Sequence, residues 1–91
     1  MYRIEFSTTF KKSYKLAMKR GRPIEKLDAV IRKLSNGETL PASNRDHALS
    51  GNMEGFRECH IQADWLLVYR IKEVLEILYL VDTGTHSDIF G

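Results

Sequence analysis

The sequence contains a single cysteine, which excludes an internal disulfide of the kind that stabilises many small secreted domains. No apolar run reaches the roughly 18 to 20 residues that a membrane-spanning helix needs. The N-terminus, Met1 to Phe6, carries charged residues where a signal peptide has an apolar segment. We therefore expect a cytoplasmic protein with no membrane association.

The length of 91 residues leaves room for one hydrophobic core, so we expect a single domain covering residues 1–91. The net charge of +2 conceals an uneven distribution. Residues 1–37 hold ten Lys/Arg and three Asp/Glu, whereas residues 38–91 hold four and nine. The basic part is either a solvated face that attracts the acidic part within the fold, or a surface for nucleic acid.

The N-terminal third has the pattern of a strand followed by two helices. Residues 2–6 alternate apolar and charged side chains, which predicts a short strand with one buried face. Ser7 to Thr9 offer N-cap oxygens, and Gly21 and Pro23 suit the turn between two helices. The apolar stripes of the two helices are Phe10, Tyr14, Ala17 and Met18, then Ile24, Leu27, Val30, Ile31 and Leu34. These stripes predict an antiparallel helical hairpin that packs on a sheet.

The remainder of the chain predicts a long loop and then three strands. Residues 38–54 lack periodicity and are rich in turn formers, with Leu49 expected to pin the loop to the core. The expected strands cover residues 56–61, 65–71 and 74–81, and the last two are nearly apolar on both faces. The helical hairpin can cover one face only, so the tail Ile89-Phe90 or a partner chain must cover part of the other.

Titratable side chains lie at the ends of the two most apolar strands. His60 and Asp64 precede the first of them, and His86 follows the second. If these strands pair antiparallel through a turn at Lys72-Glu73, residues 60–65 and 82–90 converge at one end of the sheet. The third histidine, His47, lies in the long loop.

Two kinds of chemistry fit these residue types. Imidazole and carboxylate groups both bind zinc, but the spacings of 13, 4 and 22 residues from His47 through His60 and Asp64 to His86 match no common zinc pattern. Acid–base catalysis fits better, because imidazoles titrate near neutral pH. RNA cleavage through the 2′-OH needs a base for that hydroxyl, an acid for the departing 5′-oxygen, and positive charge or hydrogen-bond donors on the phosphate.

Other residues have a functional and a structural interpretation. Trp65 and Phe90 could stack on unpaired bases or anchor the core. Arg57 and Arg70 could contact a phosphate, or pair with acids on the surface such as Glu58. Cys59 alternates away from His60 along its strand, so we interpret it as a small buried residue and not as a nucleophile.

Three blocks of residues follow one another in the second half of the chain. They are Leu40-Pro41 with Arg45-Asp46-His47-Ala48-Leu49-Ser50-Gly51, then Gly55-Phe56-Arg57-Glu58-Cys59-His60-Ile61 with Asp64-Trp65, and finally Thr83-Gly84-Thr85-His86-Ser87-Asp88-Ile89-Phe90. In this order they resemble the YafQ branch of the RelE-type toxins. The resemblance covers the whole chain, since the N-terminal strand and the basic helical hairpin also fit.

The resemblance implies an α+β, RelE-like fold of the microbial-ribonuclease type, with a two-helix hairpin on a twisted, mainly antiparallel sheet. It implies a toxin of a type II toxin–antitoxin pair that cuts mRNA in the ribosomal A site, an mRNA interferase, without a metal or other cofactor. The implied partners are the ribosome and its mRNA, a cognate DinJ/RelB-type antitoxin that wraps the toxin, and operator DNA through the antitoxin complex only.

The resemblance also assigns roles to individual residues. The family's functional positions that match are His47, His60, Asp64, Trp65, His86 and Phe90. In the resulting hypothesis His60 and Asp64 handle the 2′-OH proton, His86 is the acid or phosphate clamp, and His47 assists. Trp65 and Phe90 position the bases, and Arg57 or Arg70 supplies positive charge. Ribosomal RNA is expected to bind Lys11, Lys12, Lys15 and Lys19.

One position departs from the family pattern. An arginine usually stands where this sequence has Asp82, and an aspartate there would repel the scissile phosphate. Catalysis is therefore expected to be weaker, unless Arg57 or Arg70 supplies the charge. The alternative is a catalytically dead relative that binds antitoxin, operator DNA or the ribosome. A bare nucleic-acid-binding domain is a third interpretation, but it leaves the clustering of His and Asp unexplained.

Overall fold

The computed structural model describes residues 1–91 as five strands and three α-helices. The elements are β1 (Arg3–Phe6), α1 (Thr8–Lys19), α2 (Ile24–Ser35), β2 (His47–Ala48), β3 (Arg57–Gln62), β4 (Trp65–Lys72), β5 (Ile77–Gly84) and α3 (His86–Phe90), with 3-10 turns η1 (Ala42–Asn44) and η2 (Gly51–Met53). The strands form one sheet in the order β1-β5-β4-β3-β2. Only β1 and β5 run parallel, so the predicted α+β fold with a mainly antiparallel sheet is confirmed. No helix has the length and apolar character required to cross a membrane.

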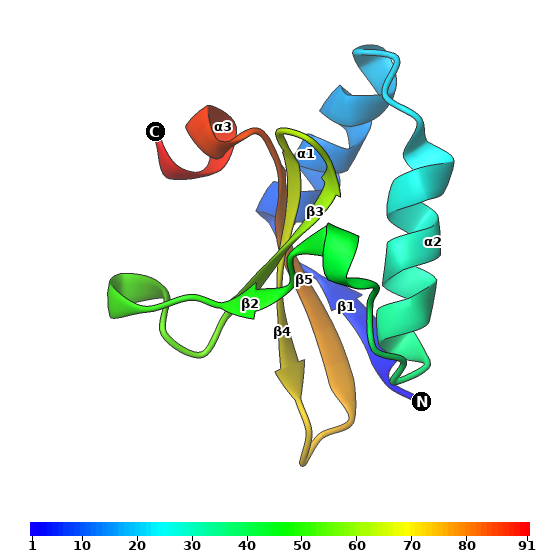
Figure 1. The fold of residues 1–91 in the computed structure, drawn as a ribbon, viewed down its shortest axis with the longest axis vertical. Coiled ribbons are helices and arrows are strands. Elements are labelled where there is room, and N and C mark those ends of the chain that lie inside the picture. Colours follow the sequence, from blue (N-terminus) through cyan, green and yellow to red (C-terminus); the bar gives the residue numbers. More distant parts are fainter.

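The helical hairpin covers one face of this sheet (Figure 1). Ser7 caps α1 by accepting a hydrogen bond from the Phe10 amide (2.9 Å), and Gly21 adopts a φ of 74° in the turn that follows. The buried residues that the hairpin contributes are Phe10, Ala17, Leu27, Val30, Ile31 and Leu34. They pack against Cys59, Trp65, Leu67, Tyr69, Leu78 and Leu80 of the sheet, so the predicted hairpin and its core face are confirmed.

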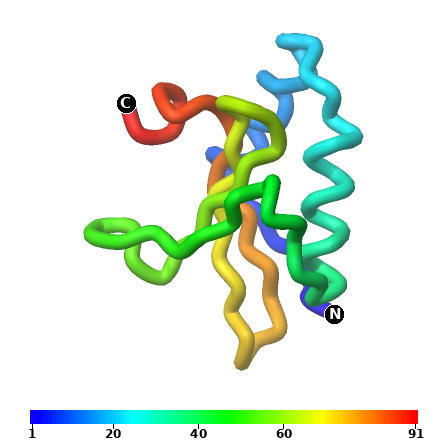
Figure 2. Tube along the Cα trace, viewed as in Figure 1, coloured from blue at the N-terminus to red at the C-terminus, as the bar shows by residue number.

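The other face of the sheet carries α3 and the loop before β3. Figure 2 shows the chain path of both, with the red C-terminal segment and the light-green part of the loop, residues 49–56, lying away from α2. Trp65 to Tyr69 of β4 are all buried, as predicted for a central strand with two covered faces. Residues that alternate along β4 therefore face either the hairpin or the side of α3.

The edge strand β1 differs from the prediction of one buried face. All four of its residues are exposed, and Ile4 and Phe6 retain 38% and 49% of their accessible surface. The reason is that the hairpin packs mainly over the centre of the sheet and leaves the β1 edge beside α1 uncovered. An apolar groove results, which is described below.

The connection between β4 and β5 is longer than predicted. The turn covers residues 73–76 instead of Lys72-Glu73, and β5 begins at Ile77 and not at residue 74. Val74 and Leu75 are 97% and 61% exposed, although their apolar character suggested a strand. Glu76 closes the turn with a φ of +54°, a conformation that a strand residue does not adopt.

The long loop contains a strand that its sequence pattern did not indicate. β2 pairs antiparallel with β3 and places His47 opposite Glu58. Leu40, which is 8% exposed, belongs to the core, whereas Leu49 is only half-buried. The loop is thus pinned at Leu40 and by β2, and the expectation for Leu49 was wrong.

Candidate active site

The carboxylate of Glu58 lies at the centre of three histidine side chains. Its Oε1 atom is 3.9 Å from Nε2 of His47, 3.7 Å from Nε2 of His60 and 3.7 Å from Nε2 of His86. The Glu58 side chain is 6% exposed, whereas those of His47 and His86 are 50% and 55% exposed. The buried acid is therefore the floor of a cluster that opens to solvent, which we call the histidine cluster (Glu58, His47, His60 and His86).

The sheet explains how these residues meet. Glu58 and His60 share one face of β3 because side chains alternate along a strand, and the pairing of β2 with β3 brings in His47. Leu66 of β4 pairs with both His60 and Gly84, so the end of β5 delivers His86 to the same place. The predicted convergence of residues 60–65 and 82–90 is confirmed.

Hydrogen bonds orient all three imidazoles in the same way. Nδ1 of His47 is 2.7 Å from the backbone oxygen of Arg45, and Nδ1 of His60 is 3.1 Å from the backbone oxygen of Ala63. Nδ1 of His86 is 2.7 Å from the carboxylate of Asp64. Because these oxygens can only accept, each Nδ1 carries a hydrogen, and each neutral imidazole directs its Nε2 lone pair toward Glu58. The cluster therefore presents four hydrogen-bond acceptor atoms to one point.

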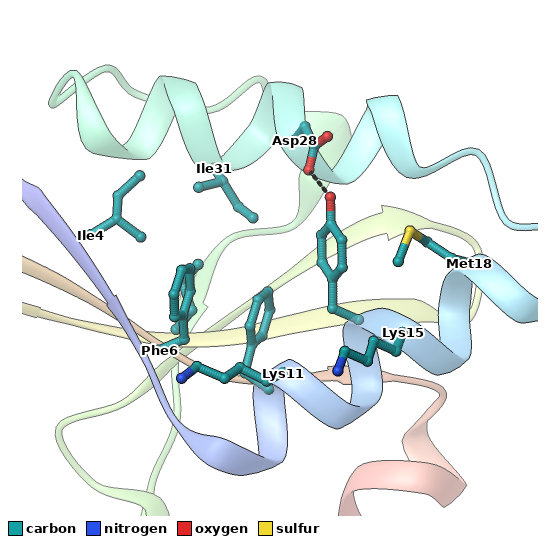
Figure 3. Close-up of a pocket in the computed structure, with 10 residues that line it drawn as sticks. Ile4, Phe6, Lys11, Lys15, Met18, Asp28 and Ile31 are labelled. Atoms are coloured by element: carbon teal, nitrogen blue, oxygen red, sulfur yellow. Dashed lines mark hydrogen bonds between the residues drawn. The ribbon is translucent and has the colours of Figure 1, made fainter.

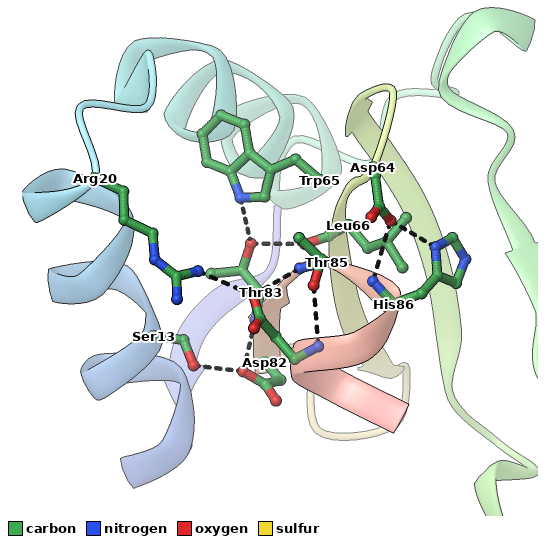
Figure 4. Close-up of polar contacts among 10 residues, drawn as sticks. Ser13, Arg20, Asp64, Trp65, Leu66, Asp82, Thr83, Thr85 and His86 are labelled. Atoms are coloured by element: carbon green, nitrogen blue, oxygen red, sulfur yellow. Dashed lines mark hydrogen bonds and ion pairs between the residues drawn. The ribbon is translucent and has the colours of Figure 1, made fainter. Parts of the chain in front are cut away.

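Asp64 holds His86 in place and does not contact His60. Its Oδ1 atom accepts hydrogen bonds from both Nδ1 (2.7 Å) and the backbone amide (3.1 Å) of His86 (Figure 4). These bonds, the side-chain one first, keep the pKa of Asp64 below its ordinary value of 3.8. The hypothesis that Asp64 handles the 2′-OH proton together with His60 is therefore corrected, because the side chain that Asp64 binds is His86.

The short helix α3 is fastened independently of Asp64. Thr85 and Asp88 form a capping box, in which the Thr85 Oγ1 accepts from the Asp88 amide and the Asp88 carboxylate accepts from the Thr85 amide, each at 3.0 Å. The Thr85 amide bond chiefly lowers the pKa of Asp88, which also pairs with Arg20 of α1 at 3.2 Å. A Cβ at Gly84 would lie 2.9 Å from the Asp88 Cβ, so only glycine allows this close approach.

Of the two aromatic residues predicted to position RNA, the structure supports one. The Phe90 ring is 47% exposed and its centroid is 6.3 Å from that of His86, so a base could stack on it. Trp65 is 0% exposed, its indole N–H donates to Thr83 Oγ1 (3.0 Å), and Arg22 lies over its ring. Trp65 is therefore a core anchor, and the expectation that it contacts RNA is wrong for this conformation.

The two candidate arginines lie on opposite faces of the sheet. Arg57 faces away from Glu58 and pairs with Asp46 (3.3 Å), whose hydrogen bond raises the pKa of Arg57. The same carboxylate accepts a 2.5 Å hydrogen bond from the Tyr69 hydroxyl. The phosphate role expected for Arg57 is therefore wrong. Arg70 is exposed, lies over the Phe56 ring, and shares the face of Val68 that carries the histidine cluster.

Asp82 is directed toward α1 and not toward the histidine cluster (Figure 4). Its Oδ1 atom accepts a 2.6 Å hydrogen bond from the Ser13 hydroxyl and a 2.8 Å bond from the Thr83 amide. The aspartate thus fastens α1 to β5. This arrangement reduces the repulsion of a bound phosphate that the sequence suggested.

Sequence reasoning missed Glu58, the centre of the cluster. It was interpreted as a surface partner of arginine, yet it is 4% exposed and surrounded by imidazoles. The available signal was its position two residues before His60 on a strand, because that spacing places both side chains on one face. Cys59 was assigned correctly, since it is fully buried on the opposite face and burial raises the pKa of its thiol to about 12.

Three members of the cluster could also hold a metal ion. Glu58, His60 and His86 each offer one ligand atom, and these atoms lie within 4.8 Å of one another. Nitrogen and carboxylate ligands of this kind suit zinc or copper and leave a coordination position open. The geometry therefore brings together three candidate metal ligands that the spacing along the sequence did not indicate.

The structure contains several cavities besides the open face of the histidine cluster. An apolar groove of about 530 Å³ follows the exposed edge of β1 beside the hairpin (Figure 3). It is lined by Ile4, Phe6, Phe10, Lys11, Tyr14, Lys15, Met18, Asp28, Ile31 and Leu80. A second cavity of about 380 Å³ is lined in part by His60.

Comparison with known proteins identifies the family. A sequence profile described as "Bacterial toxin of type II toxin-antitoxin system, YafQ" matches residues 2–91. The chain belongs to the YafQ toxin family. It is 38% identical over 89 residues to the mRNA interferase toxin YafQ of Escherichia coli K12, which covers 97% of this chain and 95% of the relative.

Solved structures of YafQ toxins share the whole fold. The crystal structure of YafQ from E. coli BL21(DE3) is 36% identical and superposes with a TM-score of 0.93 over all of both chains. YafQ in an E. coli DinJ–YafQ complex is 37% identical with a TM-score of 0.90, again over all of both chains. A metal-bound toxin from Helicobacter pylori is 40% identical with a TM-score of 0.93, covering 99% of this chain and all of the relative.

The bond between Asp64 and His86 predicts a pH dependence in this YafQ-family chain. Because the folded-state pKa of Asp64 is lowered, the bond stabilises α3 fully above about pH 4 and is lost as the pH falls through the lowered pKa. We expect the backbone amide resonance of His86 to shift in that acid range in ¹H–¹⁵N spectra. The shift should vanish in Asp64→Asn and persist in Asp88→Asn, which alters the neighbouring acid. A His86 amide that responds equally in both variants would contradict the assignment.

Proposed function

We propose that this chain is an mRNA interferase, an endoribonuclease that attacks a phosphodiester with the adjacent 2′-OH. The observation that carries the proposal is the convergence of His60 and His86 on one open site, with Glu58 beneath them. Their facing ligand atoms lie within 4.8 Å, close enough for both to bond oxygens attached to one phosphorus. The name of the E. coli relatives, mRNA interferase toxin YafQ, supports the same reaction.

In the proposed mechanism His60 is the base and His86 the acid. The Nε2 lone pair of His60 takes the 2′-OH proton as the 2′-oxygen bonds to phosphorus, and protonated His86 gives a proton to the departing 5′-oxygen. The products are a 2′,3′-cyclic phosphate and a 5′-hydroxyl. Asp64 and Glu58 stabilise the imidazolium of His86, while Phe90 stacks on a base and Arg70 supplies positive charge.

Replacing His86 tests this assignment directly. We expect His86→Ala to lower translation-dependent mRNA cleavage by about 10²–10⁴-fold, the range typical of a lost general acid. Asp64→Ala should cost less, because Asp64 acts through His86. Glu73→Ala, which changes an exposed residue of the β4–β5 turn, is the matched control and should cleave normally. Undiminished cleavage in His86→Ala would remove that residue from the mechanism.

Asp82 is the position at which this chain departs from the family pattern. The usual family arginine at this position would stabilise charge on the phosphate, and Arg70 is the exposed cation left on the cluster's face of β4. The alternative suggested by Asp82 in the sequence, a toxin that cleaves weakly or only binds antitoxin or ribosome, is not favoured by the names of the E. coli relatives. Expression in growing cells separates them, because growth arrest without cut messages indicates a ribosome blocker.

We expect Asp82→Arg to raise the cleavage rate, since it introduces a positive charge at the position where the family usually has an arginine. The substitution also breaks the hydrogen bond from Ser13. Ser13→Ala removes that bond without changing charge, and so measures its structural cost separately. If Asp82→Arg cleaves more slowly than Ser13→Ala, the aspartate has a catalytic role of its own.

We also propose that the exposed lysines of α1 dock the toxin on ribosomal RNA, which places the histidine cluster over mRNA in the A site. Lys11, Lys12, Lys15 and Lys19 are all exposed. Many lysines on one helix suit a surface that is dense in phosphates. We place the protein in the cytoplasm, where ribosomes are, and assign operator binding to the antitoxin complex alone.

The apolar groove along β1 is proposed to receive an acidic segment of a DinJ/RelB-type antitoxin. Exposed Ile4, Phe6 and Met18 line it, and Lys11 and Lys15 give its rim a positive charge (Figure 3). The E. coli relative forms a complex with DinJ. Because Lys11 and Lys15 also belong to the proposed ribosomal face, a segment bound here would compete with ribosome docking.

The groove proposal predicts that Phe6→Glu weakens the complex with the cognate antitoxin. The new carboxylate lies in the apolar groove and repels an acidic segment, so the Kd should rise about tenfold or more in calorimetric titration. Val74→Glu makes a similar change at a fully solvated turn and should bind normally. Equal affinity in Phe6→Glu and the wild type would place the antitoxin elsewhere.

A further inference from the structure

The cavity beside His60 lies between the loop before β2 and the β3–β4 turn. It has a volume of about 380 Å³, within the range of roughly 300–1,000 Å³ that ligand pockets occupy. Its lining consists of Ser43, Arg45, His60, Ile61, Gln62 and Ala63. His60 belongs to this cavity and to the histidine cluster at once, since its Nε2 atom faces Glu58. A ligand that occupies both the cavity and the histidine cluster would therefore contact His60.

Arg45 gives this cavity an uncompensated positive charge. No acidic side chain lines the cavity, and Arg45 forms no ion pair. Of the other cations in residues 38–91, Arg57 pairs with Asp46, whereas Arg70 and Lys72 lie over aromatic rings away from this cavity. The guanidinium of Arg45 is therefore available to an anion, and its planar set of donors suits a phosphate.

The backbone of Arg45 is held in an unusual conformation. Its φ of 48° and ψ of 43° lie in the left-handed region, which residues other than glycine rarely adopt. This conformation accompanies the 2.7 Å bond between the Arg45 carbonyl and Nδ1 of His47. The backbone of Arg45 thus orients His47, while its side chain lines the cavity beside His60. Strain of this kind is concentrated at functional sites.

We infer that the cavity is a subsite for the nucleotide on the 5′ side of the cleaved bond, with Arg45 binding its 5′-phosphate. The inference rests on the proposed function, in which His60 takes the proton of the 2′-OH on that same nucleotide. The chain entering from the 5′ side therefore passes His60 and reaches the cavity, while the 3′ nucleotide lies toward His86 and Phe90. The Ser43 hydroxyl and the Gln62 amide provide hydrogen-bond partners for the sugar or base.

A pair of short nucleic acids tests this inference without requiring cleavage. The probes are the dinucleotide dA-rA, which lacks the attacking 2′-OH, and the same molecule with a 5′-phosphate. Each is titrated into the wild type, Arg45→Gln and Arg3→Gln while ¹H–¹⁵N spectra are recorded. Arg3→Gln makes the same change of charge at an exposed residue of β1 and is the matched control.

We expect the 5′-phosphate to tighten wild-type binding about tenfold and to shift the amides of Arg45 and Gln62. Arg45→Gln should lose this gain, Arg45→Lys should keep part of it, and Arg3→Gln should keep all of it. Raising the salt concentration should reduce the gain. Arg45→Gly, which suits the left-handed backbone, removes the side chain without added strain and should behave as Arg45→Gln.

Three results would overturn the subsite. They are an equal gain in Arg45→Gln, a gain produced by a 3′-phosphate instead, and no binding of either probe by the wild type. All three differ from failure of the proposed function, which appears as undiminished cleavage in His86→Ala. The histidine cluster could therefore be confirmed as catalytic while this cavity is rejected, or the reverse.

Discussion

The buried carboxylate of Glu58 is the constraint on which the site depends. A carboxylate removed from water is costly, and here the Nε2 atoms of three imidazoles from β2, β3 and α3 surround that of Glu58 at 3.7 to 3.9 Å. Each imidazole is fixed at its far nitrogen by an oxygen acceptor, so all three Nε2 atoms converge. The arrangement concentrates proton-transfer groups around one point and also accounts for the metal-binding geometry of the same residues.

The position of α3 follows from several weak interactions acting together. Five residues form too short a helix to be stable alone, and the capping box, the Arg20 ion pair and the Asp64 bonds hold it at the end of β5. Gly84 permits the close approach on which these contacts depend. His86 and Phe90 therefore reach the cluster on a short segment whose orientation is set by its neighbours.

The two faces of the sheet differ in what they carry. One face packs on the hairpin and buries Trp65 and Cys59, while the other presents the histidine cluster. The basic exterior of the hairpin and the groove along β1 lie away from the cluster and share Lys11 and Lys15. A substitution in the groove therefore changes a surface that contains none of the residues of the histidine cluster.

The sequence by itself determined the helical hairpin, the two central strands and the meeting of His60, Asp64 and His86. These features follow from local periodicity and from antiparallel pairing of neighbouring strands, both of which a pattern of residues records. Tertiary structure alone decided the pairing of β2 with β3, the burial of Glu58, the contact of Asp82 with α1, and the burial of Trp65 in the core. Those outcomes depend on which face of the sheet a side chain occupies and on which distant segment packs against it. The local order of residues encodes neither of these.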